Sequence, residues 1–138
     1  MRKLSQWLEL HDSDLVAITN VGNDLVVELR GYIHAWERRD DRWAGTGSMQ
    51  SVSIRVLAGK TSWVAPFKAV ALSGGTLDVG KVFENLIPIP LVANHSTRLR
   101  LSLPAGETVE VAGDGVHVAA HGEAVFVEHL PDHLRPDA

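Results

Sequence analysis

The sequence predicts one all-β domain, an antiparallel β-sandwich or barrel with little helix. Three observations predict it: apolar and polar residues alternate at period two in many short runs, turn-forming Gly, Pro, Asn and Asp separate those runs, and almost no segment has a helical pattern. A chain of 138 residues suits a single domain. We place it at residues 1–130 and expect a frayed tail over residues 131–138, which contain two prolines and three charged residues.

The alternation is clearest from Leu25 to Ala35. Because successive side chains of a strand point to opposite faces, one face is expected to be buried and the other to point outward. The buried face carries Leu25, Val27, Leu29, Ile33 and Ala35, and the outward face carries Tyr32, His34 and Trp36. Gly31 lies in the middle of the run and indicates a bend or bulge.

Further strands are predicted wherever the same pattern recurs. They are Leu15–Asn20, Ser51–Leu57, Phe67–Leu72, Thr76–Val79, Thr97–Leu103, Thr108–Ala112 and Val116–Glu128. In the last of these, the even positions from Val116 to Phe126 are expected to form a core face. Pro88 and Pro90 confine the segment Asn85–Leu91 to a core-crossing position, which is favoured, or to a sheet edge that could pair with another chain.

Three segments are expected to be something other than strand. Leu4 to Leu8 could form one helical turn, His34–Trp43 a helical turn or a mobile loop, and the glycine-rich stretch Arg42–Ser48 a flexible connection. None of them has the spacing of a phosphate-binding loop.

Composition excludes several classes of function. The chain has no cysteine, which excludes disulfides, thiolate zinc sites and cysteine nucleophiles. A formal net charge of −4 argues against nucleic-acid binding, and no window is apolar enough for a membrane span. The segment Leu4–Leu10 is too short and too polar for a signal-peptide core, so we expect a cytoplasmic protein.

Two groups of polar residues could carry chemistry. His11 and Asp12 open a stretch that could bind a metal or act in acid–base chemistry, although such residues more often stabilise turns. His121 and Glu123 lie two residues apart on a predicted strand, about 7 Å from each other, and could share a metal with a third ligand. A solvated sheet face is the more common explanation. We assign no catalytic residue, no metal ligand and no cofactor.

The aromatic residues suggest an interface. Tyr32 and Trp36 are expected on the outward face of their strand with His34 between them, and Trp43 follows in the glycine-rich stretch. Tyr and Trp are enriched at binding hot spots because they bury a large area with few rotatable bonds. They could equally pack beneath a loop or form a second core face.

The segments His11–Leu15 and Gly122–Glu128, with the hairpin and long alternating strand after the first, resemble small bacterial β-rich families of unknown function. Some of these families are assigned as immunity proteins of toxin systems. The resemblance implies a bacterial cytoplasmic protein that binds another protein, and it implies no catalytic residue.

The sequence therefore favours a non-enzymatic β module that binds a protein partner or itself. Binding to itself would give a homodimer, and binding to a toxin would give an immunity-like role. Two alternatives remain open. One is a metal-dependent or acid–base enzyme site built on His11 and Asp12 with His121 and Glu123. The other is a small-ligand carrier with a pocket inside the sandwich or barrel.

Overall fold

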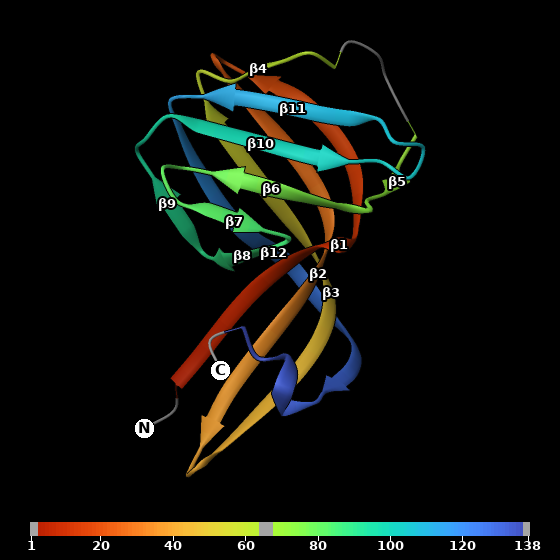
Figure 1. Cartoon of the computed structure of the whole chain (residues 1–138), viewed down its shortest axis with the longest axis vertical. Coiled ribbons are helices and arrows are strands. Elements are labelled where there is room, and N and C mark those ends of the chain that lie inside the picture. The colour runs from red at the N-terminus through yellow and green to blue at the C-terminus, as the bar shows by residue number, and fades with distance from the viewer. Residues whose placement is uncertain (1–2, 64–67, 137–138) are drawn as a thin grey trace.

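The computed structural model describes residues 3–63 and 68–136 and has two antiparallel sheets that face each other (Figure 1). Sheet A contains β1 (Lys3–Val21), β2 (Asp24–Arg39), β3 (Arg42–Leu57), β5 (Val70–Ala71), β8 (Leu86–Ile89), β9 (Leu91–Ala93) and β12 (Gly115–Leu130). Sheet B contains β4 (Lys60–Thr61), β6 (Gly74–Asp78), β7 (Val82–Glu84), β10 (Thr97–Ser102) and β11 (Thr108–Gly113). The two sheets share no strand, so the fold is a sandwich and not a closed barrel.

The core lies between the sheets and follows from the alternation. Sheet A contributes Val27, Leu29, Val52, Ile54, Val56, Val116 and Val118, and sheet B contributes Leu77, Leu99, Leu101, Val109 and Val111. All of these side chains are at most 2% exposed. On β10 the neighbours of these residues, Arg98 and Arg100, are exposed, which is the two-sided pattern of a half-buried sheet.

Four strands of sheet A continue well beyond sheet B as a twisted extension, which we call the stem (Figure 1). It consists of residues 3–9 of β1, 31–39 of β2, 42–50 of β3 and 122–130 of β12. Its first row pairs Glu9, Tyr32, Met49 and Val125 across the four strands. The first described residue, Lys3, and the last residue of β12, Leu130, both belong to the stem.

A large bulge interrupts β1 where the stem meets the sandwich. Glu9 pairs with Tyr32, but the next paired residue of β1 is Asp14, which faces Arg30. Residues 10–13 of β1 therefore lie opposite the single residue Gly31. A bend or bulge was predicted at Gly31 of β2. The bulge lies in β1, opposite Gly31, since β2 itself pairs with β3 without a register shift.

The predicted strands are confirmed in outline, with different bounds. Five of them lie wholly within strands: Leu15–Asn20, Leu25–Ala35, Ser51–Leu57, Thr108–Ala112 and Val116–Glu128. Thr76–Val79 and Thr97–Leu103 each extend one residue beyond their strand. Phe67–Leu72 contains only the two-residue β5, and Phe67 itself lies outside the described residues. The core face predicted for the last strand is right only in its first part, where Val116 and Val118 are buried. Further along, Phe126 is 55% exposed, because sheet B does not extend over the stem.

The expectations for the non-strand segments were wrong. Leu4–Leu8 belongs to β1, and the segments His34–Trp43 and Arg42–Ser48 form the far ends of β2 and β3 and the turn between them. Asp40 makes this tight turn with a φ of 54°. The segment Asn85–Leu91 combines the two expected positions. Among the described strands β8 pairs with β1 alone and so lies at an edge of sheet A, while Ile87 and Ile89 are buried in the core.

The beginning of the C-terminal tail packs against the stem. Asp132–Leu134 forms a short 3-10 turn near β3, and the guanidinium of Arg135 lies 4.4 Å from the centroid of the Trp43 ring. Residues 137 and 138 lie outside the described part. No helix in residues 3–63 and 68–136 is long and apolar enough to cross a membrane.

Candidate functional site

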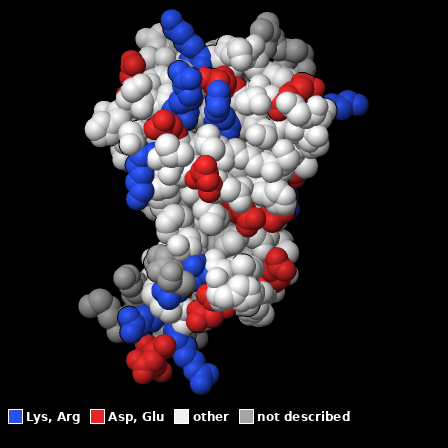
Figure 2. Space-filling model, in the orientation of Figure 1, with Lys and Arg blue, Asp and Glu red and all other residues white. Residues whose placement is uncertain are grey.

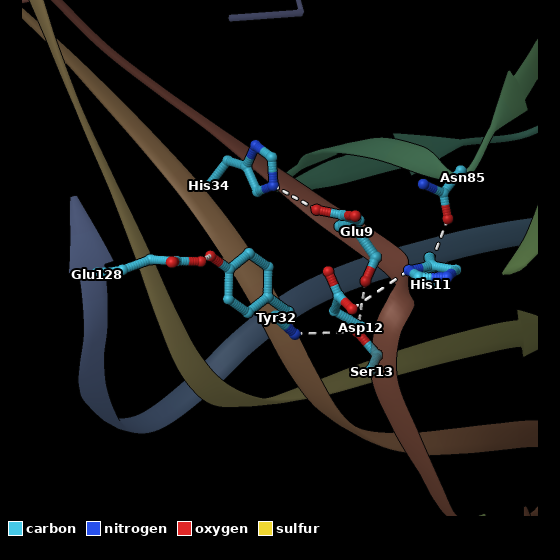
Figure 3. A network of polar contacts seen from close by, with 8 residues as sticks. All are labelled: Glu9, His11, Asp12, Ser13, Tyr32, His34, Asn85 and Glu128. Carbon is cyan, nitrogen blue, oxygen red and sulfur yellow. Dashed lines mark hydrogen bonds and ion pairs between the residues drawn. The ribbon is translucent and has the colours of Figure 1, made fainter. Parts of the chain in front are cut away.

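A polar network occupies the junction of sandwich and stem, and its centre is the bulge of β1 (Figure 3). The hydroxyl of Ser13 is fully buried, donates to the Glu9 carbonyl at 2.6 Å and accepts from the Tyr32 backbone N–H at 2.9 Å. This side chain thus replaces the backbone partner that the bulge removes from the ladder. The bulge is a built feature and not a flexible loop.

Asn85, between β7 and β8, holds the outer side of the bulge. Its backbone carbonyl accepts from Leu10 N–H at 2.8 Å, and its side-chain Oδ1 accepts from His11 N–H at 2.7 Å. Asn85 has a φ of 62°, a left-handed conformation that Asn tolerates better than most residues. Asn85 therefore holds the backbone N–H groups of both Leu10 and His11.

Glu9 and His34 form the most buried charged contact of the network. His34 Nε2 lies 2.5 Å from Glu9 Oε2, and the two side chains are 7% and 18% exposed. The hydrogen bond from His34 lowers the pKa of the Glu9 carboxyl, and this effect outweighs the burial that would raise it. Glu9 is consequently held in its charged form.

His11 and Asp12 lie at the exposed tip of the bulge, where His11 Nδ1 is 3.2 Å from Asp12 Oδ1. Desolvation raises the pKa of Asp12, and the neighbouring Glu9 carboxylate raises it further. The two carboxyl groups thus have opposite tendencies: Glu9 stays ionised and Asp12 retains its proton more readily. Such a split between neighbouring carboxyl groups is typical of sites that exchange protons.

One ligand atom each from Glu9, His11 and Asp12 lies within 4.8 Å of the others. Two carboxylates and an imidazole are donors that suit divalent transition metals. The arrangement could therefore hold a cation or exchange a proton at the tip of the bulge.

Tyr32 extends the network to the last strand. Its phenol donates to Glu128 Oε1 at 2.5 Å and passes over Gly47 of β3. Burial, followed by the bond to Glu128, raises the pKa of the Tyr32 phenol. No local pattern singles out Glu9 or Glu128, because their partners lie on other strands.

The structure does not bring His121 and Glu123 to this site. β12 is separated from β1 by β2 and β3, and three strand spacings amount to about 14 Å. His121 Nε2 instead lies 2.9 Å from Ser53 Oγ and 3.4 Å from Glu28 Oε2. The four-residue site that the sequence suggested is therefore divided, and only His11 and Asp12 lie together.

The expectation that Tyr32, His34 and Trp36 point outward was wrong, and the alternative that they form a second core face is confirmed. Tyr32 and His34 are each 6% exposed and Trp36 is fully buried. The three rings line one face of β2, with ring centroids 5.5 and 6.4 Å apart, over the glycines of β3. They form a small aromatic core for the stem, and Trp43 is half-buried beside Arg135.

Exposed apolar residues occur instead on the last strand. Val125, Phe126 and Val127 follow one another on β12 and are 52%, 55% and 49% exposed. β9 pairs only with Val116–Val118, so the outer edge of β12 beyond Val118 has no partner strand in the described part of the chain. The period-two pattern predicts Phe126 in the core and therefore does not indicate this surface.

The chain was compared with protein-family models, with curated proteins and with solved structures, and none of them matches it.

Proposed function

We propose that the chain is a non-enzymatic β module that binds protein, either another copy or a different partner, through the free edge of its stem. The observation that carries this proposal is the run Val125–Val127, three consecutive apolar side chains each about half exposed on an edge strand. Proteins usually protect such edges with charges, prolines or short strands. A run of apolar side chains exposed to solvent is typical of a surface that contacts another protein.

The contact is proposed to form through side chains and not through a continuous added strand. β12 shifts register against β3 between His121 and Val125, and again between Phe126 and Glu128. Such bulges twist a strand and interrupt the regular row of outward N–H and C=O groups. The Phe126 ring also stacks edge-on against His129, at 5.0 Å between centroids, which presents it as part of a fixed surface.

Site-specific crosslinking tests this proposal. A photoreactive phenylalanine analogue placed at Val127 should give a crosslinked adduct in cells, and the same analogue at Val82 should not. Val82 is the matched control because it is 55% exposed on β7, in the other sheet. Sedimentation of the purified chain then separates self-association from binding of a different protein. A strictly monomeric chain with no adduct specific to Val127 would refute the proposal.

An immunity-like role is one form of the same proposal, in which the partner is a toxin protein and both act in the cytoplasm of a bacterium. Its support is the resemblance of the two short segments and the net charge of −4, which suits a basic partner. Mass spectrometry of the Val127 adduct tests it directly. A partner that is not a toxin would remove this form and leave the wider proposal standing.

A second candidate is a divalent-cation site at the tip of the bulge, and the observation that favours it is the close approach of Glu9, His11 and Asp12. This candidate takes the place of the four-residue site expected from the sequence, because Glu9 joins His11 and Asp12 where His121 and Glu123 do not. Calorimetric titration of the metal-free chain with Zn²⁺ and Mn²⁺ tests it, with His11→Ala as the variant and His117→Ala, another exposed histidine, as the control. Unchanged heats in His11→Ala would eliminate this candidate.

A further inference from the structure

The outer face of sheet B is polar and rich in hydroxyl groups. Leu99 and Leu101 point into the core, so Arg98, Arg100 and Ser102 point outward from β10. The ladders place Glu110 beside Arg100 on one side and Thr76 on the other. Since side chains in register on one face are neighbours, these residues form a single surface.

This surface is hollowed. A cavity of about 410 Å³ is lined by Ser62, Gly75, Thr76, Arg100, Ser102, Thr108 and Glu110. A second cavity of about 360 Å³ shares Ser62 and Glu110 with it and adds Lys60 to its lining. The two cavities therefore form one groove across the middle of the sheet, and no aromatic or large aliphatic side chain lines it.

The groove has an excess of positive charge, although the whole chain is acidic. The Glu110 carboxylate lies between two guanidinium groups, with Arg98 Nη1 at 3.1 Å and Arg100 Nε at 3.4 Å. Outside the groove, Asp78 lies beside Arg98 and Glu84 lies beside Thr76 on the same face. The lining itself has two cations, Arg100 and Lys60, and one anion, Glu110. Figure 2 shows Lys and Arg side chains in the upper part of this face, with acidic side chains among them.

The exposed guanidinium group of Arg100 can bind an anion in addition to Glu110. Its contact with Glu110 is made by Nε at 3.4 Å, a distance that is long for a charged hydrogen bond. Its side chain is 56% exposed, compared with 33% for Glu110. Arg100 lines the cavity, and a guanidinium group can bind a carboxylate with two parallel hydrogen bonds.

We propose that this groove binds an acidic saccharide, with the sugar carboxylate on Arg100 and Lys60 and the sugar hydroxyls on Ser62, Thr76, Ser102 and Thr108. Hydroxyl side chains both donate and accept, and so match the hydroxyls of a sugar ring. The groove lacks the apolar lining that a lipid or a hydrophobic metabolite requires. This site lies on the other sheet from the stem edge and is independent of the function proposed above.

Titration of the ¹⁵N-labelled chain with three probes tests the proposal. The probes are an oligogalacturonide, the neutral galactose oligomer of equal length, and a glutamate peptide of equal charge. The oligogalacturonide should shift the amide signals of β6, β10 and β11 and bind at least tenfold more tightly than the other two. Equal binding of the glutamate peptide, or no binding of the oligogalacturonide, would overturn the proposal.

Two variants and one control locate the site. Arg100→Ala should weaken oligogalacturonide binding at least tenfold, and Thr108→Val should weaken it severalfold while retaining the shape and charge of the surface. Arg30→Ala on sheet A, another exposed arginine, should bind as the unmodified chain does. Binding that is unchanged in Arg100→Ala, or equally weakened in Arg30→Ala, would show that the groove is not the site.

Discussion

The phenol of Tyr32 lies in the space that a side chain at Gly47 would need. A Cβ atom built on Gly47 would be 2.5 Å from Tyr32 Cζ, well inside van der Waals contact. Trp36 and Gly45 have the same relationship two residues further along β3, where a Cβ atom on Gly45 would lie 2.6 Å from Trp36 Cε3. Gly45 and Gly47 of β3 therefore lie directly against the rings of Trp36 and Tyr32, where any larger residue would clash.

Gly47→Ala should destabilise the chain by about 1–3 kcal/mol, the range for overpacking a core, because the methyl group displaces the Tyr32 ring. The bond from Tyr32 to Glu128 should weaken with it. Urea unfolding measures the change in the free energy of unfolding.

The Tyr32→Ala background provides the control for this prediction. There the methyl group has room, so Gly47→Ala should cost much less than in the unmodified chain. If the cost is the same in both backgrounds, the effect comes from backbone conformation and not from the aromatic ring.

Ser13→Ala should also destabilise the fold, since it leaves the Tyr32 N–H and the Glu9 carbonyl without their common partner. The expected loss is about 1–3 kcal/mol in the free energy of unfolding. Amide hydrogen exchange of Tyr32 should become faster than in the unmodified chain. Ser51→Ala, an exposed serine on β3, should change neither quantity. Unaltered exchange at Tyr32 would contradict the bridging role of Ser13.

Stability should decrease on acidification through Glu9. The pKa of Glu9 is lower in the folded chain than its ordinary value of 4.5, so its charge stabilises the fold above that pH. This contribution is lost as the pH falls through the folded-state pKa. Glu9→Gln should therefore be less stable than the unmodified chain at pH 7, and the difference should shrink in acid. Unfolding midpoints in urea from pH 7 to pH 3 measure it, and a constant difference would contradict the assignment.

Asp12 should show the opposite dependence. Its pKa is raised in the folded chain by desolvation and by the charge of Glu9, so ionisation of Asp12 opposes folding as the pH rises through the folded-state value. Asp12→Asn should therefore be as stable as the unmodified chain at pH 7 or slightly more stable, by a few tenths of a kcal/mol, because half of the side chain is screened by solvent. A clear loss of stability would indicate that Asp12 is needed in its charged form.

The alternation of residues predicted the sandwich well because it depends on one physical fact, the burial of every second side chain. Leu99 and Leu101 are buried and Arg98 and Arg100 exposed, as their pattern requires. In the stem the pattern was right for one face only, because β2 is buried there on both faces. Ile33 is buried as predicted, but Tyr32 and Trp36 on the opposite face are buried too. They pack over Gly47 and Gly45 of β3, and an alternation of apolar residues does not show that glycines lie beneath an aromatic side chain.

The candidate site could be predicted only in part, because its contacts join residues far apart in the sequence. His11 and Asp12 were identified from their types, and both are in the network. Glu9 was missed since its partner His34 is 25 residues away, and Glu128 since Tyr32 is 96 residues away. Register between strands decides such pairs, and the four-residue bulge of β1 changes that register in a way no local pattern indicates.

The stem is assembled from four separate pieces of chain, and each of them is the continuation of a sandwich strand. No truncation at either terminus can therefore yield the sandwich alone or the stem alone. The turn at Asp40 and Asp41 is the place where β2 and β3 could be shortened together, by removing paired residues of the two strands in equal number. Force applied at that tip would reach the core along β2 and β3, which pair from the stem into the sandwich without a register shift.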